Sequence, residues 1–375
     1  MMPRPARAFF RRCACCAEPA TPAATSVDRR AFVTGALAAA GLGTALAGTS
    51  FPKPLLAQGA SAPNPRRIDI HHHFSPPKWK DSVKGKELLA PANLNWTPEK
   101  SIEDMDKGGV AAAMISITNP GIWFGDKEAT RQLARECNEY GTKLVQQHPT
   151  RFGLFCALPM PDIDATLKEI AYAFDTLKCD GAHFMTSFGD TWIGNPAHEP
   201  VIAELNRRKA VVHVHPTAAN CCKNLIPGMP AGIMEYGTDT TRAIMNLMWS
   251  GLAAKYSDVR WIWSHAGGTA PFLAGRIDRS SRRVKDKAKM PQGAMTEMKK
   301  FYYDTAGAAN PGAIASLLQL VKSDHIMFGT DFPPGGTSAQ VAKELAALGL
   351  GFTDADMRNI DRENAARLLP RLAKT

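Results

Sequence analysis

The 375-residue sequence has little of what marks a membrane protein or a nucleic-acid-binding protein. Its weakly apolar stretch at 35–48 is too short and too rich in glycine to span a bilayer stably. No stripe of lysine and arginine is interleaved with aromatic residues, so the net charge of +10 does not indicate nucleic-acid binding. One basic cluster is interpreted as a solvated helix face. It comprises Arg279, Arg282, Arg283, Lys285, Lys287 and Lys289.

Cysteines with the spacing of a disulfide framework are also missing. Three of the eight cysteines lie before residue 20, and five remain in the rest of the chain. The five are Cys137, Cys156, Cys179, Cys221 and Cys222. Their number is odd, and adjacent cysteines do not easily bridge each other. We therefore expect buried or loop thiols.

Residues 1–62 resemble an export leader. Arg29-Arg30 precede the Gly/Ala-rich stretch, and Ala60-Ser61-Ala62 offers a small-x-small cleavage site. This order is typical of a twin-arginine signal peptide, which predicts a periplasmic or secreted protein without a stable membrane span after processing. An uncleaved anchor or a disordered leader is the alternative. The segment holds seven basic and two acidic residues, so half of the net charge belongs to it.

Residues 63–375 read as one domain in which short β-like runs alternate with amphipathic stretches, a pattern that indicates a parallel sheet. Eight such units predict a single (β/α)8 TIM barrel. The expected strands are 66–71, 111–117, 152–158, 181–186, 210–215, 259–264, 301–305 and 325–330. Insertions at 74–98 and 217–238 follow strands one and five. They should lie on the catalytic face, where they could form a lid.

Histidines and an aspartate stand where these strands end, and such donors suit a bound divalent metal. His71 and His73 are two residues apart and share a face of strand one, whereas His72 points the other way. His215 lies at the rim of strand five, with His213 a layer deeper as a packed core histidine. These positions predict that His71, His73 and His215 ligate a metal.

Asp331, His265 and three further residues complete the polar set at the strand ends. Asp331 follows strand eight and closes the ring onto strand one; the alternative is a helix N-cap. His265 follows strand six and is either a fourth nitrogen ligand or a general acid/base. We expect Asp69 to be structural or to support a ligand, and Asp304 to be a buried hydrogen-bond acceptor. His183, on strand four, has no assigned role.

These motifs resemble a known family. Asp-x-His-x-His, His-Pro, His-x-Gly-Gly and Gly-Thr-Asp-x-Pro, in this order, are similar to the amidohydrolase-related decarboxylases of the aminocarboxymuconate-semialdehyde decarboxylase type. The resemblance covers residues 66–370. The stretches around 180–196, 204–218, 265–276 and 364–369 are closer still to 6-methylsalicylate decarboxylases. The resemblance implies a (β/α)8 barrel of the amidohydrolase type.

The resemblance also implies roles for individual residues. His71, His73, His215 and Asp331 match the metal ligands, and His265 matches the catalytic histidine. Arg276 falls where relatives supply an arginine that binds the substrate carboxylate across a dimer interface, so a homodimer is expected. Strand four offers no lysine for a second metal, and no glutamate lies three residues after His265. These departures disfavour a binuclear hydrolase and leave the proton relay open.

The expected activity is non-oxidative decarboxylation of a small aromatic acid of the hydroxybenzoate or salicylate type. One Zn(II) or Mn(II) ion would hold the carboxylate, Asp331 or a metal-bound water would protonate the ring, and His265 would position or relay that proton. Trp192 and Phe188 are the expected walls of an aromatic pocket. The alternatives are a metal-dependent hydrolase of a lactone or cyclic ester, and a non-catalytic periplasmic binding protein.

Overall fold

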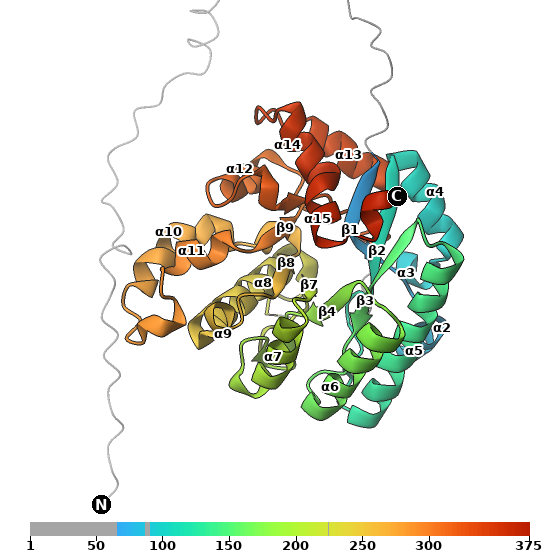
Figure 1. Ribbon diagram of the computed structural model, residues 1–375, viewed down its shortest axis with the longest axis horizontal. Coiled ribbons are helices and arrows are strands. Elements are labelled where there is room, and N and C mark those ends of the chain that lie inside the picture. Colours follow the sequence, from blue (N-terminus) through green and yellow to red (C-terminus); the bar gives the residue numbers. More distant parts are fainter. Residues whose placement is uncertain (1–65, 87–90, 224) are drawn as a thin grey trace, which may run out of the picture. The chain divides into compact units, whose positions relative to one another are not determined.

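The computed structural model describes residues 66–86, 91–223 and 225–375. Figure 1 shows strands at the centre of this part of the chain and helices around them. The predicted export leader, residues 1–62, lies outside the described residues. So does its proposed cleavage site.

Eight parallel strands form one sheet in the order β1-β2-β3-β4-β7-β8-β9-β10. Ile70 donates a backbone hydrogen bond to Phe328 (2.9 Å) and Asp331 donates one to His71 (2.8 Å), so the last strand meets the first. The predicted (β/α)8 barrel is confirmed. The strands are Arg67–His73 (β1), Val110–Ser116 (β2), Phe152–Ala157 (β3), Gly181–Met185 (β4), Val211–His215 (β7), Arg260–Trp263 (β8), Tyr302–Asp304 (β9) and Ile326–Met327 (β10).

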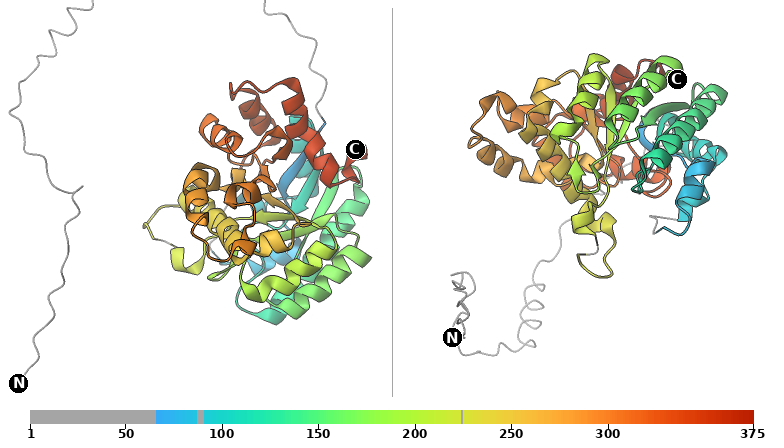
Figure 2. Two further views of the ribbon diagram at one scale, coloured as in Figure 1. Left: turned by 60° about the vertical axis from the view of Figure 1, so that its left-hand side comes forward. Right: turned by 90° about the horizontal axis from the view of Figure 1, so that it is seen from below.

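Helices follow the strands and cover the outside of the barrel (Figures 1 and 2). The longer ones are amphipathic, and several begin at a side chain that caps their first turn, such as Asp126 before α5. Their bounds are Pro77–Ser82 (α2), Pro91–Leu94 (α3), Pro98–Gly108 (α4), Lys127–Gln147 (α5), Ile163–Ala171 (α6), Glu199–Arg207 (α7), Ala231–Ser250 (α8), Leu252–Lys255 (α9), Ala270–Ser281 (α10), Ala294–Lys299 (α11), Pro311–Leu318 (α12), Ser338–Ala346 (α13), Asp354–Arg358 (α14) and Asn364–Leu368 (α15).

A β-bulge in β1 positions the first two candidate ligands. Ile68 and Ile70 belong to a buried cluster with residues of five other strands, which places them inside the barrel. The register with β2 shifts between Asp69 and His72. Because a bulge re-aims side chains, His71 follows Ile70 into the interior. Asp69 and His72 bond each other and face outward toward α4.

Two local expectations need correction. The second insertion is shorter than predicted, because α8 already begins at Ala231 and not at 239. The chain after β4 also forms an unpredicted hairpin, in which β5 (Ser187–Phe188) pairs antiparallel with β6 (Thr191–Trp192). Strands this short carry too little alternation to be recognised from sequence.

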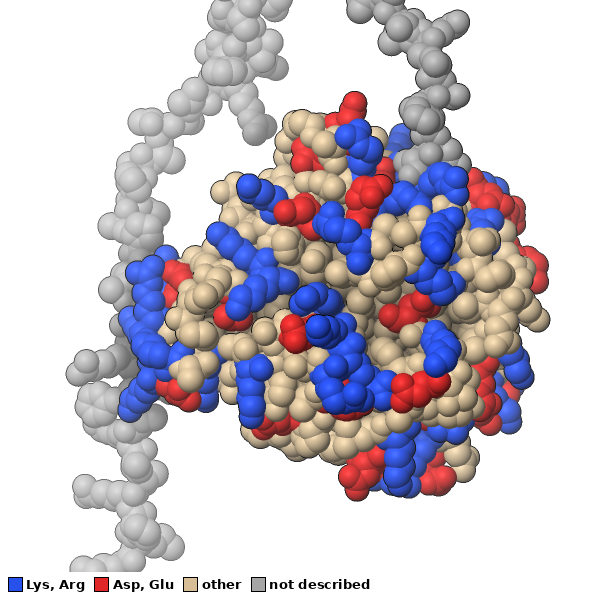
Figure 3. Space-filling view, viewed as in Figure 1, with Lys and Arg blue, Asp and Glu red and all other residues tan. Residues whose placement is uncertain are grey.

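The surface and thiol expectations largely hold. The basic cluster is mostly exposed, although it runs from the end of α10 into a loop and a short turn instead of one helix face. On the face in Figure 3, positive and negative side chains are interspersed. The five described cysteines are free. No helix in the described ranges has the length and apolar character needed to cross a membrane.

Candidate functional site

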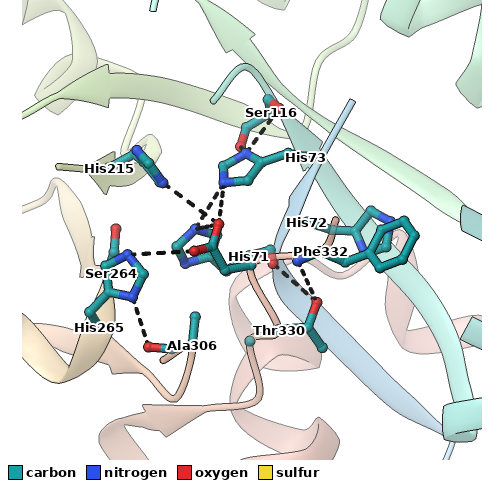
Figure 4. Close-up of polar contacts among 12 residues, drawn as sticks. His71, His72, His73, Ser116, His215, Ser264, His265, Ala306, Thr330 and Phe332 are labelled. Carbon is teal, nitrogen blue, oxygen red and sulfur yellow. Dashed lines mark hydrogen bonds and ion pairs between the residues drawn. The ribbon is translucent and has the colours of Figure 1, made fainter. Parts of the chain in front are cut away.

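Four of the predicted site residues converge at the carboxyl ends of the strands. One ligand atom each of His71, His73, His215 and Asp331 lies within 4.8 Å of all the others. The Nε2 atoms of His71 and His73 are 3.1 Å apart. Asp331 Oδ1 is 2.9 Å from His73 Nε2, 3.4 Å from His71 Nε2 and 3.8 Å from His215 Nε2. Figure 4 shows these imidazoles turned toward one point.

The other ring nitrogen of each histidine faces an acceptor. Nδ1 of His71 lies 2.9 Å from Asp304, Nδ1 of His73 lies 3.2 Å from the Ser116 carbonyl, and Nδ1 of His215 lies 2.9 Å from the Pro216 carbonyl. A carboxylate or carbonyl oxygen only accepts, so each Nδ1 must carry the proton of the neutral ring. In the neutral form of each ring, Nε2 presents a lone pair to the other two rings and to Asp331.

Such a set of lone pairs is repulsive unless a cation lies among them. The buried atoms His215 Nε2 and Asp331 Oδ1 have no hydrogen-bond partner in the described chain, and orphaned buried acceptors are costly. Three imidazoles and one carboxylate are a donor set that Zn(II) and Mn(II) accept. The residues therefore fit one divalent metal ion.

The charges of the site also favour a cation. Burial holds the pKa of His73 at about 4 and that of His215 at about 3, so both are neutral near pH 7. Burial would also lower the pKa of His71, but Asp304 and Asp331 outweigh it and raise this pKa to about 10. The neighbouring histidines hold the pKa of Asp331 well below its usual range despite burial. Two carboxylates thus face one histidine that carries an extra proton, and a bound metal ion would take the place of that proton.

Asp304 links the candidate ligands to His265. One of its carboxylate oxygens accepts from His71 Nδ1 and from His213 Nε2 (3.2 Å), and the other accepts from the backbone N–H of His265 (2.9 Å). This confirms Asp304 as a buried acceptor. His213 is fully buried in these contacts, as expected for a core histidine.

Asp331 reaches the cluster because of its backbone. Its φ is +59°, a left-handed conformation that aspartate tolerates better than most residues. A Cβ on Gly335 would lie 2.5 Å from the Cβ of Asp331, so only glycine fits there. The helix-cap alternative is wrong, because Thr337 caps α13.

Outside this cluster, Asp69 and His72 form a closed structural network. Asp69 accepts from Thr330, both N–H (3.1 Å) and hydroxyl (2.6 Å), and from His72 Nδ1 (3.0 Å). His72 Nε2 is 2.9 Å from the Ser101 hydroxyl, and the ring stacks on Phe332 (Figure 4). Both expectations are confirmed: Asp69 ties β1 to the segment after β10, and His72 points away from the cluster.

His265 stands beside the four candidate ligands and not among them. Its Nε2 is 4.0 Å from Asp331 Oδ2, and its Nδ1 lies 2.8 Å from the Ala306 carbonyl. Because the carbonyl only accepts, Nδ1 carries a proton. Figure 4 shows the other side of the ring facing the cluster. A side-chain exposure of 20% leaves this ring open to a bound molecule. The geometry suits a proton carrier.

A cavity of about 740 Å³ lies at the same end of the barrel, and its lining includes His183, whose ring centroid is 6.2 Å from that of His215. Its volume is room for a small aromatic molecule. Phe188 lines it as predicted. Trp192 does not: its indole N–H donates to Asp239 of α8 (2.7 Å) and anchors the β5–β6 hairpin. The aromatic wall is completed by Trp123 and Phe124, which sequence reasoning missed. Their only sequence signal was a glycine- and proline-rich segment after strand two.

The two insertions reach this cavity. Lys86 of the first, and Thr217, Asn220, Lys223 and Tyr236 in or near the second, are among its lining residues. Arg276 is exposed on α10 and is not among the residues that line this cavity.

Comparisons with known proteins agree with this geometry. A family model described as Amidohydrolase matches residues 68–371. Decarboxylase yanB of Aspergillus niger is 36% identical over 81% of this chain and 88% of its own length. The 6-methylsalicylic acid decarboxylase acuB of Aspergillus aculeatus is 33% identical over 82% and 97%. The structure of 5-carboxyvanillate decarboxylase from Novosphingobium aromaticivorans, solved with manganese, superposes with a TM-score of 0.72 at 19% identity, covering 81% and 96% of the two chains.

Proposed function

Because this chain belongs to the amidohydrolase family, we propose that it is a metal-dependent carboxy-lyase. Its substrate would be a small aromatic acid of the hydroxybenzoate or salicylate type. Relatives that match about four fifths of the chain are decarboxylases, two of them of 6-methylsalicylic acid. The aromatic wall of Trp123, Phe124 and Phe188 beside the candidate metal site suits a planar ring.

One observation carries the proposal. The Nε2 atoms of three histidines lie 2.9–3.8 Å from one carboxylate oxygen of Asp331, and two of these four buried atoms, His215 Nε2 and Asp331 Oδ1, have no hydrogen-bond partner in the described chain. His71, His73, His215 and Asp331 would hold a single Zn(II) or Mn(II) ion. When bound, that ion supplies positive charge that orients an aromatic carboxylate with its neighbouring hydroxyl and stabilises developing negative charge.

The chain's own residues would move the proton. Decarboxylation adds one proton to the ring carbon and breaks its bond to the carboxylate, whose electron pair returns to the ring as CO2 leaves. His265 takes up a proton at Nε2, the nitrogen that faces the cluster, and delivers it to that carbon directly or through Asp331. The Ala306 carbonyl keeps the ring oriented through Nδ1 throughout.

The test is a screen for CO2 release from hydroxybenzoates, combined with metal analysis of the purified protein. We expect one metal per chain and CO2 release that stops when a chelator removes the metal. Opening of a lactone without CO2 release would instead favour the hydrolase alternative. A purified protein that binds aromatic acids, holds no metal and turns nothing over would favour the binding protein.

We also propose that two copies form a homodimer in which Arg276 of one subunit completes the partner's site. Arg276 is exposed and lies one turn after Phe272, whose side chain is 82% exposed. An exposed aromatic beside an unpaired arginine suits an interface. The guanidinium would bind the substrate carboxylate through two hydrogen bonds.

The export proposal rests on residues 1–62 alone. We propose that Arg29-Arg30 direct the folded protein to the periplasm or beyond. Replacing both arginines with lysine should leave an unprocessed protein in the cytoplasm, detected by cell fractionation and by the mass of the chain. Normal export of that variant would contradict the proposal.

A further inference from the structure

His183 is a buried histidine that the proposed mechanism does not use. It lies on β4, paired in register with His213 of β7, two residues before the rim position Met185. Its residue exposure is 5%, and it lines the cavity. Ala157, the residue opposite it on β3, is small and also lines the cavity, so the cavity extends inward to this layer.

The nitrogen Nε2 of His183 has no hydrogen-bond partner in the described chain. A buried polar atom without a partner is costly, and at the wall of a cavity it indicates a missing ligand atom. A neutral imidazole has one protonated nitrogen, which donates, and one bare nitrogen, which accepts.

A chain of hydrogen bonds decides which nitrogen is bare. Asp304 accepts from two backbone N–H groups through one oxygen and faces the imidazoles of His71 and His213 with the other, so it serves as the acceptor. His213 Nε2 lies 3.2 Å from Asp304 and must donate to it, which leaves His213 Nδ1 as an acceptor. His183 Nδ1, 3.4 Å from that atom, must then be the donor. Nε2 of His183 is the bare nitrogen and can only accept.

We infer that His183 selects substrates that carry a hydrogen-bond donor on the ring, such as a second hydroxyl or an amino group. This inference rests on the proposed function for the substrate class, and it adds the residue and the group that it recognises. A methyl group at the same ring position would leave Nε2 unpaired. By the usual cost of an unpaired buried polar atom, that difference corresponds to about tenfold to hundredfold in affinity.

The experiment uses matched ligand pairs. Each pair is 2-hydroxybenzoate carrying either a methyl or a hydroxyl group at position 3, 4, 5 or 6. Calorimetry on the metal-loaded protein gives a dissociation constant for each ligand, and CO2 release is measured separately. We expect the unaltered protein to prefer the hydroxyl member of at least one pair by about tenfold or more.

Two variants separate recognition from folding. His183→Leu removes the acceptor and should abolish the preference. His183→Gln should keep most of it, because the amide nitrogen can donate to His213 while the amide oxygen accepts from the ligand. Comparing ratios between variants cancels the intrinsic difference between methyl and hydroxyl. The thermal midpoint and metal content of each variant report on structure independently.

The outcomes separate this inference from the proposed function. A hydroxyl preference that depends on His183 without CO2 release would support the inference and contradict the decarboxylase proposal. CO2 release without such a preference, or a preference that survives in His183→Leu, would overturn the inference alone. Failure of all these ligands to bind would overturn both.

Discussion

The two ends of the barrel treat their polar groups in opposite ways. At the amino-terminal end, Arg371 donates to both oxygens of Asp180 (2.7 Å each) and to the carbonyls of Pro149 and Phe152 (2.8 Å each). Arg67 likewise donates to Asp361 and to a carbonyl oxygen. At the carboxyl-terminal end, the ligand atoms of four candidate metal ligands converge, and two of them, His215 Nε2 and Asp331 Oδ1, have no hydrogen-bond partner in the described chain.

The difference separates stability from function. A network whose polar groups are all hydrogen-bonded contributes to folding by itself. Buried polar groups without partners destabilise the fold until a ligand binds them. Barrel enzymes generally keep their chemistry at the carboxyl-terminal face. Substitutions at the carboxyl-terminal end should therefore change metal content and turnover, whereas substitutions at the amino-terminal end should change stability alone.

The largest effect should come from the candidate ligands. His71→Ala, His73→Ala or His215→Ala should each lose bound metal and activity, because the site loses a direct donor. The loss of metal affinity should exceed the roughly 10–100-fold that removing an outer partner costs. Metal content and CO2 release are the measurements.

His72→Ala is the matched control, because it removes the neighbouring imidazole that bonds Asp69 and Ser101 outside the cluster. It should keep its metal. If His72→Ala lost its metal while His73→Ala kept it, His72 and not His73 would face the metal site.

His265→Ala should keep the metal and lower turnover by roughly 10²–10⁴-fold, the usual range for a general acid/base. Its Nε2 lies 4.0 Å from Asp331, and His265 is not one of the four residues whose ligand atoms converge. Turnover at saturating substrate and metal content are measured together. A variant that loses its metal would show that His265 is a ligand.

At the opposite end, Arg371→Ala should lower the free energy of unfolding by about 2 kcal/mol and leave turnover unchanged, because Asp180 and two carbonyls lose their donor. The Asp180 side chain is only 8% exposed. Arg282→Ala breaks the exposed pair with Asp278 and should cost less than about 1 kcal/mol. Urea unfolding gives the free energy of unfolding of both variants. Equal losses in the two variants would contradict the prediction that the buried network matters more than the exposed pair.

The smallest expected effect concerns Arg276. Arg276→Ala should raise KM for an anionic substrate several-fold and leave metal content unchanged. If the proposed homodimer forms, mixing His265→Ala with Arg276→Ala subunits should restore part of the activity. Demonstrated heterodimers that stay inactive would place Arg276 outside any site.

The positions of the candidate ligands could be predicted because they follow from local rules. Strand alternation gives the shared face of His71 and His73, and parallel strands bring their carboxyl ends together. The bulge in β1 changed which residue below them faces inward without disturbing that pair. The fold followed from the same alternation of strands and helices.

Apart from Phe188, the aromatic wall of the cavity could not be predicted, because it depends on distant contacts. Trp192 is held by Asp239, 47 residues away, and nothing in the sequence around Trp192 indicates that partner. Trp123 and Phe124 lie in a loop whose path is set by packing and not by a repeating pattern. The role proposed for Arg276 would depend on a second chain, which no local pattern describes.

The left-handed backbones of Asp331 (φ +59°) and His265 (φ +54°) have a consequence for protein engineering. Holding a residue other than glycine in this conformation costs of order 1 kcal/mol, and both positions here are tied to the chemistry. A selection for heat resistance alone would favour glycine at either position. Variants improved in that way should be screened for turnover at every round, since the gain in robustness and the loss of catalysis would come from the same substitution.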